Sequence, residues 1–230
     1  MRINKYLSEA GVCSRRKADE LIDSGVVCIN GVPATKGSQV EAEDSVTVKG
    51  KSVGRQVKKI YLAFYKPVGI ECTANREVKD NIIDYIGYPE RIFPVGRLDK
   101  NSEGLILLTN DGDLGNEILK ARNFHEKEYI VRVDKTVDEA FLNKMRNGVE
   151  ILDTKTRPCV VEPMHGNQFK IILTQGLNRQ IRRMCETLGY SVVKLKRVRV
   201  LNIVLGDLEK GKWRHLTDRE LKQLKSMLLK

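Results

Sequence analysis

Residues 96–112 read GRLDKNSEGLILLTNDG, and they combine two segments of opposite character. The first, Gly96 to Gly104, is polar and bounded by glycines, which predicts a loop. The second, Leu105 to Thr109, is a continuous apolar run of the length expected for a buried strand. A charged loop carrying Arg97 and Asp99 is therefore attached to a core strand, an arrangement that often holds catalytic side chains. By residue types alone, a surface loop with a solvated ion pair is the more usual interpretation.

The composition of the 230-residue chain fits one sizeable domain plus a small one. Apolar residues make up 41% and charged residues 31%, which suits a soluble protein with a real core. The net charge of +11 favours a polyanionic partner, although a generic basic surface is the alternative. The five cysteines include no Cys-x-x-Cys, and the three histidines are far apart. We therefore expect reduced thiols in a cytoplasmic protein, no metal site and no membrane segment.

Residues 1–50 form a separate unit in the apolar pattern. Ile3 begins a first helix, and Ser14 caps a second helix that runs from Arg15 to Ser24. A strand follows, and Asn30-Gly31 predicts a tight hairpin turn. The strings GVCSRR (11–16) and GVVCING (25–31) resemble the S4 RNA-binding domain. This resemblance implies that the second helix contacts RNA.

The candidate RNA contacts in this unit are Arg15, Arg16 and Lys17, at the start of the second helix. The helix dipole disfavours cations there, whereas backbone amides at the same end bind anions. That placement fits phosphate contact. A mutually paired, solvated helix surface is the alternative, because Arg16 and Glu20 are four residues apart.

Residues 51–59 lack periodicity and predict a linker, and residues 60–230 have an α+β pattern. Strands without regular βαβ alternation favour a mixed, largely antiparallel sheet flanked by helices. The pattern predicts a capping box at Thr136 and another at Thr217, each opening a helix. Trp213, in a late predicted strand, is expected in the core.

A predicted helix from Arg179 to Leu188 carries a cluster of cations. At 100° per residue its apolar residues share one side, and the other side presents Arg179, Arg182 and Arg183. The spacing thus predicts an exposed basic ridge over a buried stripe. On residue types alone, a surface helix supported by an Arg182–Glu186 pair is an alternative.

Three strings in this part of the chain resemble the motifs of one enzyme family. GRLD followed by GLILLTNDG resembles the catalytic-aspartate motif of the RsuA-like RNA pseudouridine synthases. QGLNRQIRRM (175–184) resembles the family's third motif, and KEY (127–129) resembles its tyrosine motif. The resemblance implies that the catalytic residues are Asp99, Tyr129 and Arg182, with Arg182 paired to Asp99.

Further site residues follow from the same resemblance. Arg97 is expected to fill the space left by a flipped nucleotide, with a phosphate contact as the alternative. RNA contacts are expected at Asn178, Arg179, Gln180 and Arg183. Asp99 would act on the ribose, either by attacking C1′ or by abstracting the 2′ proton.

The resemblance implies an isomerase that converts a specific uridine of ribosomal RNA to pseudouridine without a cofactor. The strings GLNRQIRRMCE and HEKEY are most similar to the F-type large-subunit (23S) branch. A 16S substrate and a non-catalytic S4-type RNA-binding or ribosome assembly factor are the alternatives. We expect a cytoplasmic monomer whose partner is an RNA stem-loop.

Overall fold

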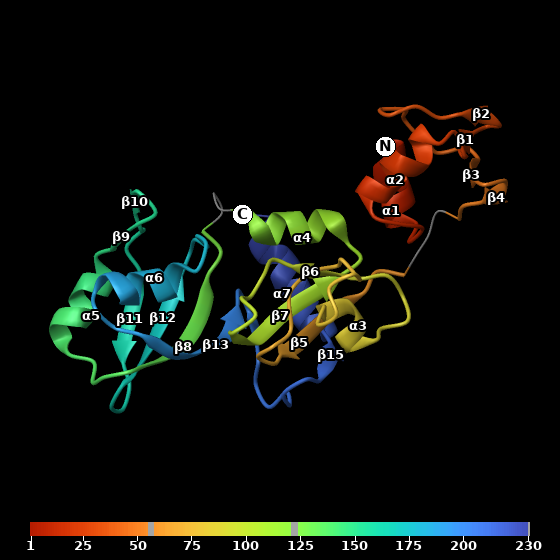
Figure 1. The fold of residues 1–230 in the computed structure, drawn as a ribbon. Helices are drawn as coiled ribbons and strands as arrows, with labels where there is room; N and C mark the ends of the chain where they lie inside the picture. The colour runs from red at the N-terminus through yellow and green to blue at the C-terminus, as the bar shows by residue number, and fades with distance from the viewer. Residues whose placement is uncertain (55–57, 121–123, 230) are drawn as a thin grey trace. The chain divides into compact units, whose positions relative to one another are not determined.

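The computed structural model describes residues 1–54, 58–120 and 124–229 and divides into two compact units (Figure 1). The smaller unit contains Met1–Ile60 with two short segments, Pro89–Arg91 and Asn110–Gly112. The larger unit contains the remaining residues from Tyr61 onward. Each unit is described by itself.

The smaller unit packs two helices on a four-stranded sheet. Its elements are α1 (Ile3–Glu9), α2 (Arg15–Asp23), β1 (Val27–Ile29), β2 (Val32–Pro33), β3 (Val46–Val48) and β4 (Lys51–Ser52), with the strands in the order β2-β1-β3-β4. The Ser14 hydroxyl accepts a hydrogen bond from the Lys17 amide, which confirms the predicted cap. Asn30 and Gly31 have φ of 51° and 82° and join β1 to β2, which confirms the hairpin.

The predicted linker differs from the structure at its start. Lys51 and Ser52 form β4, which pairs with β3 inside the small sheet, and the Tyr6 hydroxyl donates to the Val53 carbonyl. The first residues of the linker therefore belong to the smaller unit. Residues 55–57 of the predicted linker lie outside the described residues.

The larger unit is built on a nine-stranded sheet. The main strand order is β11-β12-β8-β13-β7-β5-β15, with β6 beside β7 and β14 beside β13. Among the described strands, β13 and β7 pair in parallel and the other pairings are antiparallel, as the sequence predicts. These strands are β5 (Tyr61–Lys66), β6 (Phe93–Val95), β7 (Glu103–Thr109), β8 (Lys127–Val133), β11 (Val160–Pro163), β12 (Gln168–Leu173), β13 (Val192–Val200), β14 (Ile203–Val204) and β15 (Trp213–His215).

Two apolar clusters pack on this sheet, and β13 contributes to both. Val131, Phe169 and Leu195 belong to the cluster under α5 and α6, whereas Leu105 and Val200 belong to the cluster under α4 and α7 (Figure 1). The remaining elements are α3 (Ile82–Ile86), α4 (Gly112–Leu119), α5 (Glu139–Arg146), α6 (Gln180–Thr187), α7 (Asp218–Leu228) and a small hairpin of β9 (Glu150–Ile151) and β10 (Thr154–Lys155).

The strand after the Asp99 loop begins earlier than the sequence predicts. β7 includes Glu103 and Gly104, which pair with Lys196 and Arg197 of β13. A Cβ on Gly104 would lie 2.2 Å from the Arg197 carbonyl oxygen, and its φ is 113°. This glycine permits close approach of two strands and does not mark the end of the loop.

Two further predictions need correction. The α5 N-cap is Asp138, whose carboxylate accepts from the Phe141 amide, so the helix begins two residues after the predicted Thr136 cap. Trp213 is 37% exposed, because β15 is the edge strand of the sheet and no strand follows it there. The cap at Thr217, by contrast, is confirmed as a capping box with Glu220.

Candidate active site

A cleft of about 470 Å³ lies beside Asp99 in the larger unit. Asp99 reaches it from the loop before β7, Tyr129 and Lys127 from β8, and Arg179 from the start of α6. The structure therefore brings together the three sequence motifs that lie 30 to 80 residues apart. The Asp99 side chain is 33% exposed, so it is accessible from the cleft.

The Asp99 loop is held from behind by backbone contacts. The Ser102 amide donates to the Asp99 carbonyl at 3.0 Å, and the Leu98 amide donates to the Cys72 sulfur at 3.3 Å. Leu98 and Ser102 are themselves buried. The loop thus presents the Asp99 carboxylate while its neighbours in sequence are fixed in the core.

Arg182 lies beneath the loop, contrary to the exposed ridge that the helical spacing predicts. Its side chain is only 7% exposed. The guanidinium donates to the carbonyls of Val192 and Asn101 at 3.1 and 2.9 Å, and to the Ser102 hydroxyl at 3.3 Å. Burial lowers the pKa of Arg182, and the neighbouring Arg179 lowers it further. The side chain is buried because α6 presses this face against the loop, where carbonyl oxygens satisfy the cation.

Arg182 also faces the Asp99 carboxylate. Its Nε lies 4.0 Å from Asp99 Oδ2, and that buried nitrogen has no hydrogen-bond partner in the described structure. One terminal nitrogen is committed to Val192 of β13 and the other to Asn101 and Ser102 of the loop, so Arg182 does not form a two-point fork with Asp99. An unused donor aimed at a carboxylate is consistent with a contact that tightens when substrate binds.

Arg179 supplies a second cation at the same oxygen. Its Nη1 lies 3.8 Å from Asp99 Oδ2, and its side chain is 38% exposed. Arg179 is the N-cap of α6 and has φ of 51°, a left-handed conformation that directs the chain sharply into the helix. Sequence reasoning assigned Arg179 to RNA contact and missed its place beside Asp99.

Lys127 and Tyr129 share one face of β8 because alternate strand residues point the same way. Both line the cleft. Burial, reinforced by Arg197, lowers the pKa of Lys127 to about 8, and its ammonium donates to the His125 carbonyl at 3.2 Å. Lys127 was absent from the predicted site, although its spacing from Tyr129 could have indicated it.

Arg197 is a second cleft residue that the sequence did not indicate. It is 4% exposed, and its Nε donates to the Leu105 carbonyl at 2.7 Å. Arg197 therefore connects β13 to β7 and contributes positive charge beneath Lys127. Basic and apolar residues alternate along this strand, so no sequence pattern distinguishes Arg197 as the buried arginine.

The predicted RNA contacts at the start of α6 and just before it divide into two groups. Asn178 and Arg183 contact each other at the surface, with Arg183 Nε donating to the Asn178 carbonyl at 3.1 Å. Gln180 differs from the prediction, because it is 4% exposed and its amide oxygen accepts from the Leu177 amide at 3.1 Å. Gln180 thus supports the turn before α6 and does not present its amide to solvent.

Arg97 is exposed and lines two hollows, the main cleft and a second one of about 440 Å³. The second hollow includes Gly69 and Lys100. Arg97 therefore lies at the rim beside Asp99, between the two hollows.

In the smaller unit, Arg15 and Arg16 are exposed at the start of α2. Lys17 forms an ion pair with Glu20 at 2.6 Å. The alternative of a mutually paired, solvated helix surface therefore applies to Lys17.

Neither a metal cluster nor a membrane span is found in residues 1–54, 58–120 and 124–229. No group of three or more histidine, cysteine, aspartate or glutamate side chains there is arranged to hold a metal. No described helix is both long and apolar enough to cross a membrane.

Comparison with known proteins identifies the class to which this fold and cleft belong. Residues 51–187 match the profile of the RNA pseudouridylate synthase family, and residues 1–46 match the S4 domain. The chain belongs to the RNA pseudouridylate synthase family and is an isomerase with an S4 RNA-binding domain.

Individual relatives agree with this assignment. The chain is 52% identical over 223 residues to the dual-specificity RNA pseudouridine synthase RluF of Escherichia coli K12, covering 96% of this chain and 77% of that protein. It is 34% identical to the ribosomal large subunit pseudouridine synthase B of Bacillus subtilis, covering 98% and 96%. A crystal structure of a pseudouridylate synthase superposes with a TM-score of 0.72 at 28% identity, over 97% of this chain and 99% of that one.

Proposed function

We propose that this protein isomerises one specific uridine in a stem-loop of 23S ribosomal RNA, with Asp99 as the catalytic residue. The observation that carries the proposal is the exposed Asp99 carboxylate in a cleft, faced by Arg179 and Arg182 at 3.8 and 4.0 Å. Relatives that are about half identical are named RNA pseudouridine synthases, and another is named for the large ribosomal subunit. A 16S substrate is the alternative.

The reaction breaks the bond between N1 of uracil and C1′ of the ribose, and forms a bond between C5 and C1′. C5 loses its proton and N1 gains one, directly or through solvent, so reactant and product have the same composition and no oxidant or reductant is needed. Asp99 acts on the ribose, by attack at C1′ or by removal of the 2′ proton. Either role needs an ionised, oriented carboxylate, and the two guanidinium groups provide the orientation.

The remaining cleft residues hold the flipped nucleotide. The Tyr129 ring stacks on uracil, since base-modifying enzymes hold an extruded base between aromatic or apolar side chains. Arg97, at the rim, occupies the space that the nucleotide leaves. Lys127 contributes positive charge near the bound RNA. Arg182 acts as a positioning residue because its hydrogen bonds go to the loop that carries Asp99.

Phosphate contacts come from both units. Asn178 and Arg183 lie at the surface beside the cleft, and we assign Arg15 and Arg16 to RNA contact by the S4 unit, since Lys17 is paired with Glu20. We place the S4 domain at residues 1–50 with its sheet extending to Ser52, and the catalytic domain at residues 60–230. The protein works as a monomer in the cytoplasm.

The central experiment is replacement of Asp99 by asparagine. Asp99→Asn should abolish pseudouridine formation in a short stem-loop while RNA affinity stays within about tenfold, because cations elsewhere supply most of the affinity. Pseudouridine is measured by carbodiimide labelling and primer extension, and affinity by fluorescence anisotropy. Near wild-type turnover in a folded Asp99→Asn variant would remove Asp99 from the reaction.

The substrate is identified by mapping pseudouridine in the RNA of a strain that lacks this protein. Loss of one site in 23S RNA is expected, restored by the wild-type gene and not by Asp99→Asn. Loss of a pseudouridine in 16S RNA alone would show that the small-subunit RNA is the substrate. Because relatives are named dual-specificity, transfer RNA is mapped in the same samples. An unchanged RNA profile would support a non-catalytic role in ribosome assembly.

A further inference from the structure

Three aromatic side chains cluster at the edge of the large sheet, away from the residues that line the active-site cleft. Trp213 and His215 lie two residues apart on β15, so they share a face of that strand. The Tyr88 ring lies 5.1 Å from the Trp213 ring and 6.0 Å from the His215 ring, and the Tyr88 hydroxyl is 3.4 Å from His215 Nε2. These three side chains are called the edge aromatic cluster.

The geometry of the cluster leaves aromatic surface accessible. The Trp213 ring meets Tyr88 at 72° and His215 at 90°, so both contacts are edge-to-face and neither ring stacks in parallel on the indole. Trp213 is 37% exposed, and Tyr85 on the adjoining α3 is 47% exposed. The site of a Cβ on Gly211 is 2.6 Å from the Tyr85 hydroxyl, which places Tyr85 beside the turn into β15.

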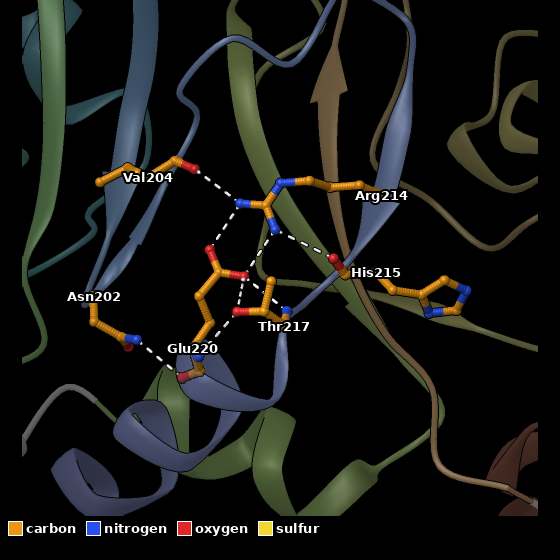
Figure 2. Close-up of polar contacts among 6 residues, drawn as sticks. All are labelled: Asn202, Val204, Arg214, His215, Thr217 and Glu220. Carbon is orange, nitrogen blue, oxygen red and sulfur yellow. Dashed lines mark hydrogen bonds and ion pairs between the residues drawn. The ribbon is translucent and has the colours of Figure 1, made fainter.

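The opposite side of β15 is joined to α7 by the polar contacts that Figure 2 shows. Arg214 lies between Trp213 and His215 and points the other way, and both its terminal nitrogens contact the Glu220 carboxylate at 2.8 Å. Glu220 also accepts from the Thr217 amide at 2.9 Å, which joins the strand to the first turn of α7. The His215 ring points away from this network. The cluster is therefore displayed on a fixed strand.

The surroundings of the edge aromatic cluster are those of a basic protein surface. The chain has one tryptophan in 230 residues, and the structure places it at an exposed sheet edge among other rings. Exposed Lys212 precedes it in a protein of net charge +11. Aromatic rings beside cations are the usual platform for unpaired bases, because every base has a π face and the backbone is anionic.

We propose that the edge aromatic cluster is a second RNA-binding site, which stacks an unpaired base of the substrate on Trp213 outside the active-site cleft. This inference rests on the proposed function, because it takes the same RNA as its ligand. The base is recognised by stacking, so the site tolerates any of the four bases. Its role is affinity for RNA with single-stranded nucleotides next to the target stem, and it takes no part in the chemical step.

The single tryptophan allows a direct test in the full-length protein. Titration with a stem-loop bearing unpaired flanking nucleotides should quench Trp213 fluorescence with the same Kd that anisotropy of labelled RNA gives. Trimming the RNA to a blunt stem-loop should remove the quenching and weaken binding. Trp213→Leu should weaken binding of the flanked RNA about 5- to 100-fold, as expected for loss of one stacked base.

Two controls separate stacking from structural damage. Trp213→Phe keeps an aromatic face and should bind within about threefold of wild type, whereas the leucine variant should bind weakly. The rate of a single turnover at saturating RNA should be the same in all three proteins. If Trp213→Leu does not fold, the quenching of wild-type Trp213 fluorescence by flanked but not blunt RNA tests the stacking.

The outcomes distinguish this proposal from the proposed function. Isomerisation of the RNA without quenching, together with normal binding by Trp213→Leu, would overturn the second site and leave the enzyme assignment intact. Quenching without isomerisation would support the second RNA-binding site and overturn the enzyme assignment. Unchanged fluorescence with RNA but quenching by a protein partner would show that the cluster is a protein interface and overturn the proposal.

Discussion

Replacement of Arg182 by lysine is expected to disable the active site even though the positive charge is retained. The guanidinium reaches two carbonyls that lie far apart in sequence, Asn101 and Val192, through two different terminal nitrogens. A lysine ammonium is a single point and cannot occupy both positions. At least one of these carbonyl acceptors then loses its partner.

The size of the effect follows from the position of these bonds. A fully buried carbonyl left without a donor costs about 1–3 kcal/mol, and because these two hydrogen bonds are only partly buried we expect a stability loss of about 1 kcal/mol. Asn101 and Ser102 lie two and three residues after Asp99, and release of their contacts lets the carboxylate shift. A misplacement of about 1 Å costs on the order of 100-fold in rate. We therefore expect Arg182→Lys to lower the single-turnover rate about 100-fold, and Arg182→Met to lower it further.

The assay is single-turnover pseudouridine formation at saturating stem-loop RNA, with urea denaturation measured in parallel. Arg183→Met is the matched control, because Arg183 is the next residue on α6 and contacts Asn178 at the surface. It should raise the apparent KM and reduce the salt slope by about one phosphate, with kcat largely kept. A single-turnover rate within threefold of wild type in Arg182→Lys would refute the positioning role. If Arg183→Met lost the chemical step and Arg182→Met kept it, Arg183 and not Arg182 would be the residue that positions the Asp99 loop.

Three further predictions test the S4 unit, the cleft charge and the scaffold. Removal of residues 1–55 should leave a folded catalytic unit that binds RNA more weakly and with a shallower salt dependence; an unchanged salt slope would exclude the S4 unit from binding. RNA affinity should fall as pH rises through about 8, because Lys127 has a lowered pKa of about 8 and loses its charge there, and Lys127→Met should bind with a flatter pH profile. Arg214 holds the pKa of Glu220 at about 2 in the folded protein. The ionised Glu220 carboxylate therefore stabilises the fold fully above its unfolded pKa near 4.5, and this stabilisation is lost as pH falls through 2. After allowance for solvent exposure, Glu220→Gln should cost about 1–2 kcal/mol in urea unfolding at pH 7 and less at pH 3, whereas an equal loss at both pH values would contradict the ion pair.

Local features of the fold could be predicted because they depend on neighbouring residues. Ser14 and Thr217 cap helices through side chains three residues from the amide that they satisfy, and Asn30-Gly31 supplies two left-handed residues for a hairpin. The apolar run after Gly104 indicated a buried strand, and β7 is buried throughout. The motifs around Asp99, Tyr129 and Arg182 also pointed to residues that the structure brings to one region.

The features that sequence reasoning missed depend on contacts between distant residues. Helical spacing placed Arg182 on an exposed ridge, but a carbonyl 81 residues away makes burial of the cation favourable. Trp213 was expected in the core, yet only the strand order shows that β15 lies at an edge. Gly104 resembled a loop boundary, whereas its missing side chain accommodates the backbone of Arg197.

The parallel pairing of β7 with β13 has a consequence for how activity appears during folding. It joins the part of the sheet that carries Asp99 to the part that carries Tyr129, and Arg197 reaches the Leu105 carbonyl across 92 residues. Closing so long a loop is entropically costly, and contacts between distant residues slow folding. The apolar cluster under α4 and α7 also spans this connection, because it combines Leu105 of β7 with Val200 of β13. Asp99 and Tyr129 therefore face one cleft only in a molecule in which β7 and β13 have paired, so we expect activity to appear together with this long-range contact.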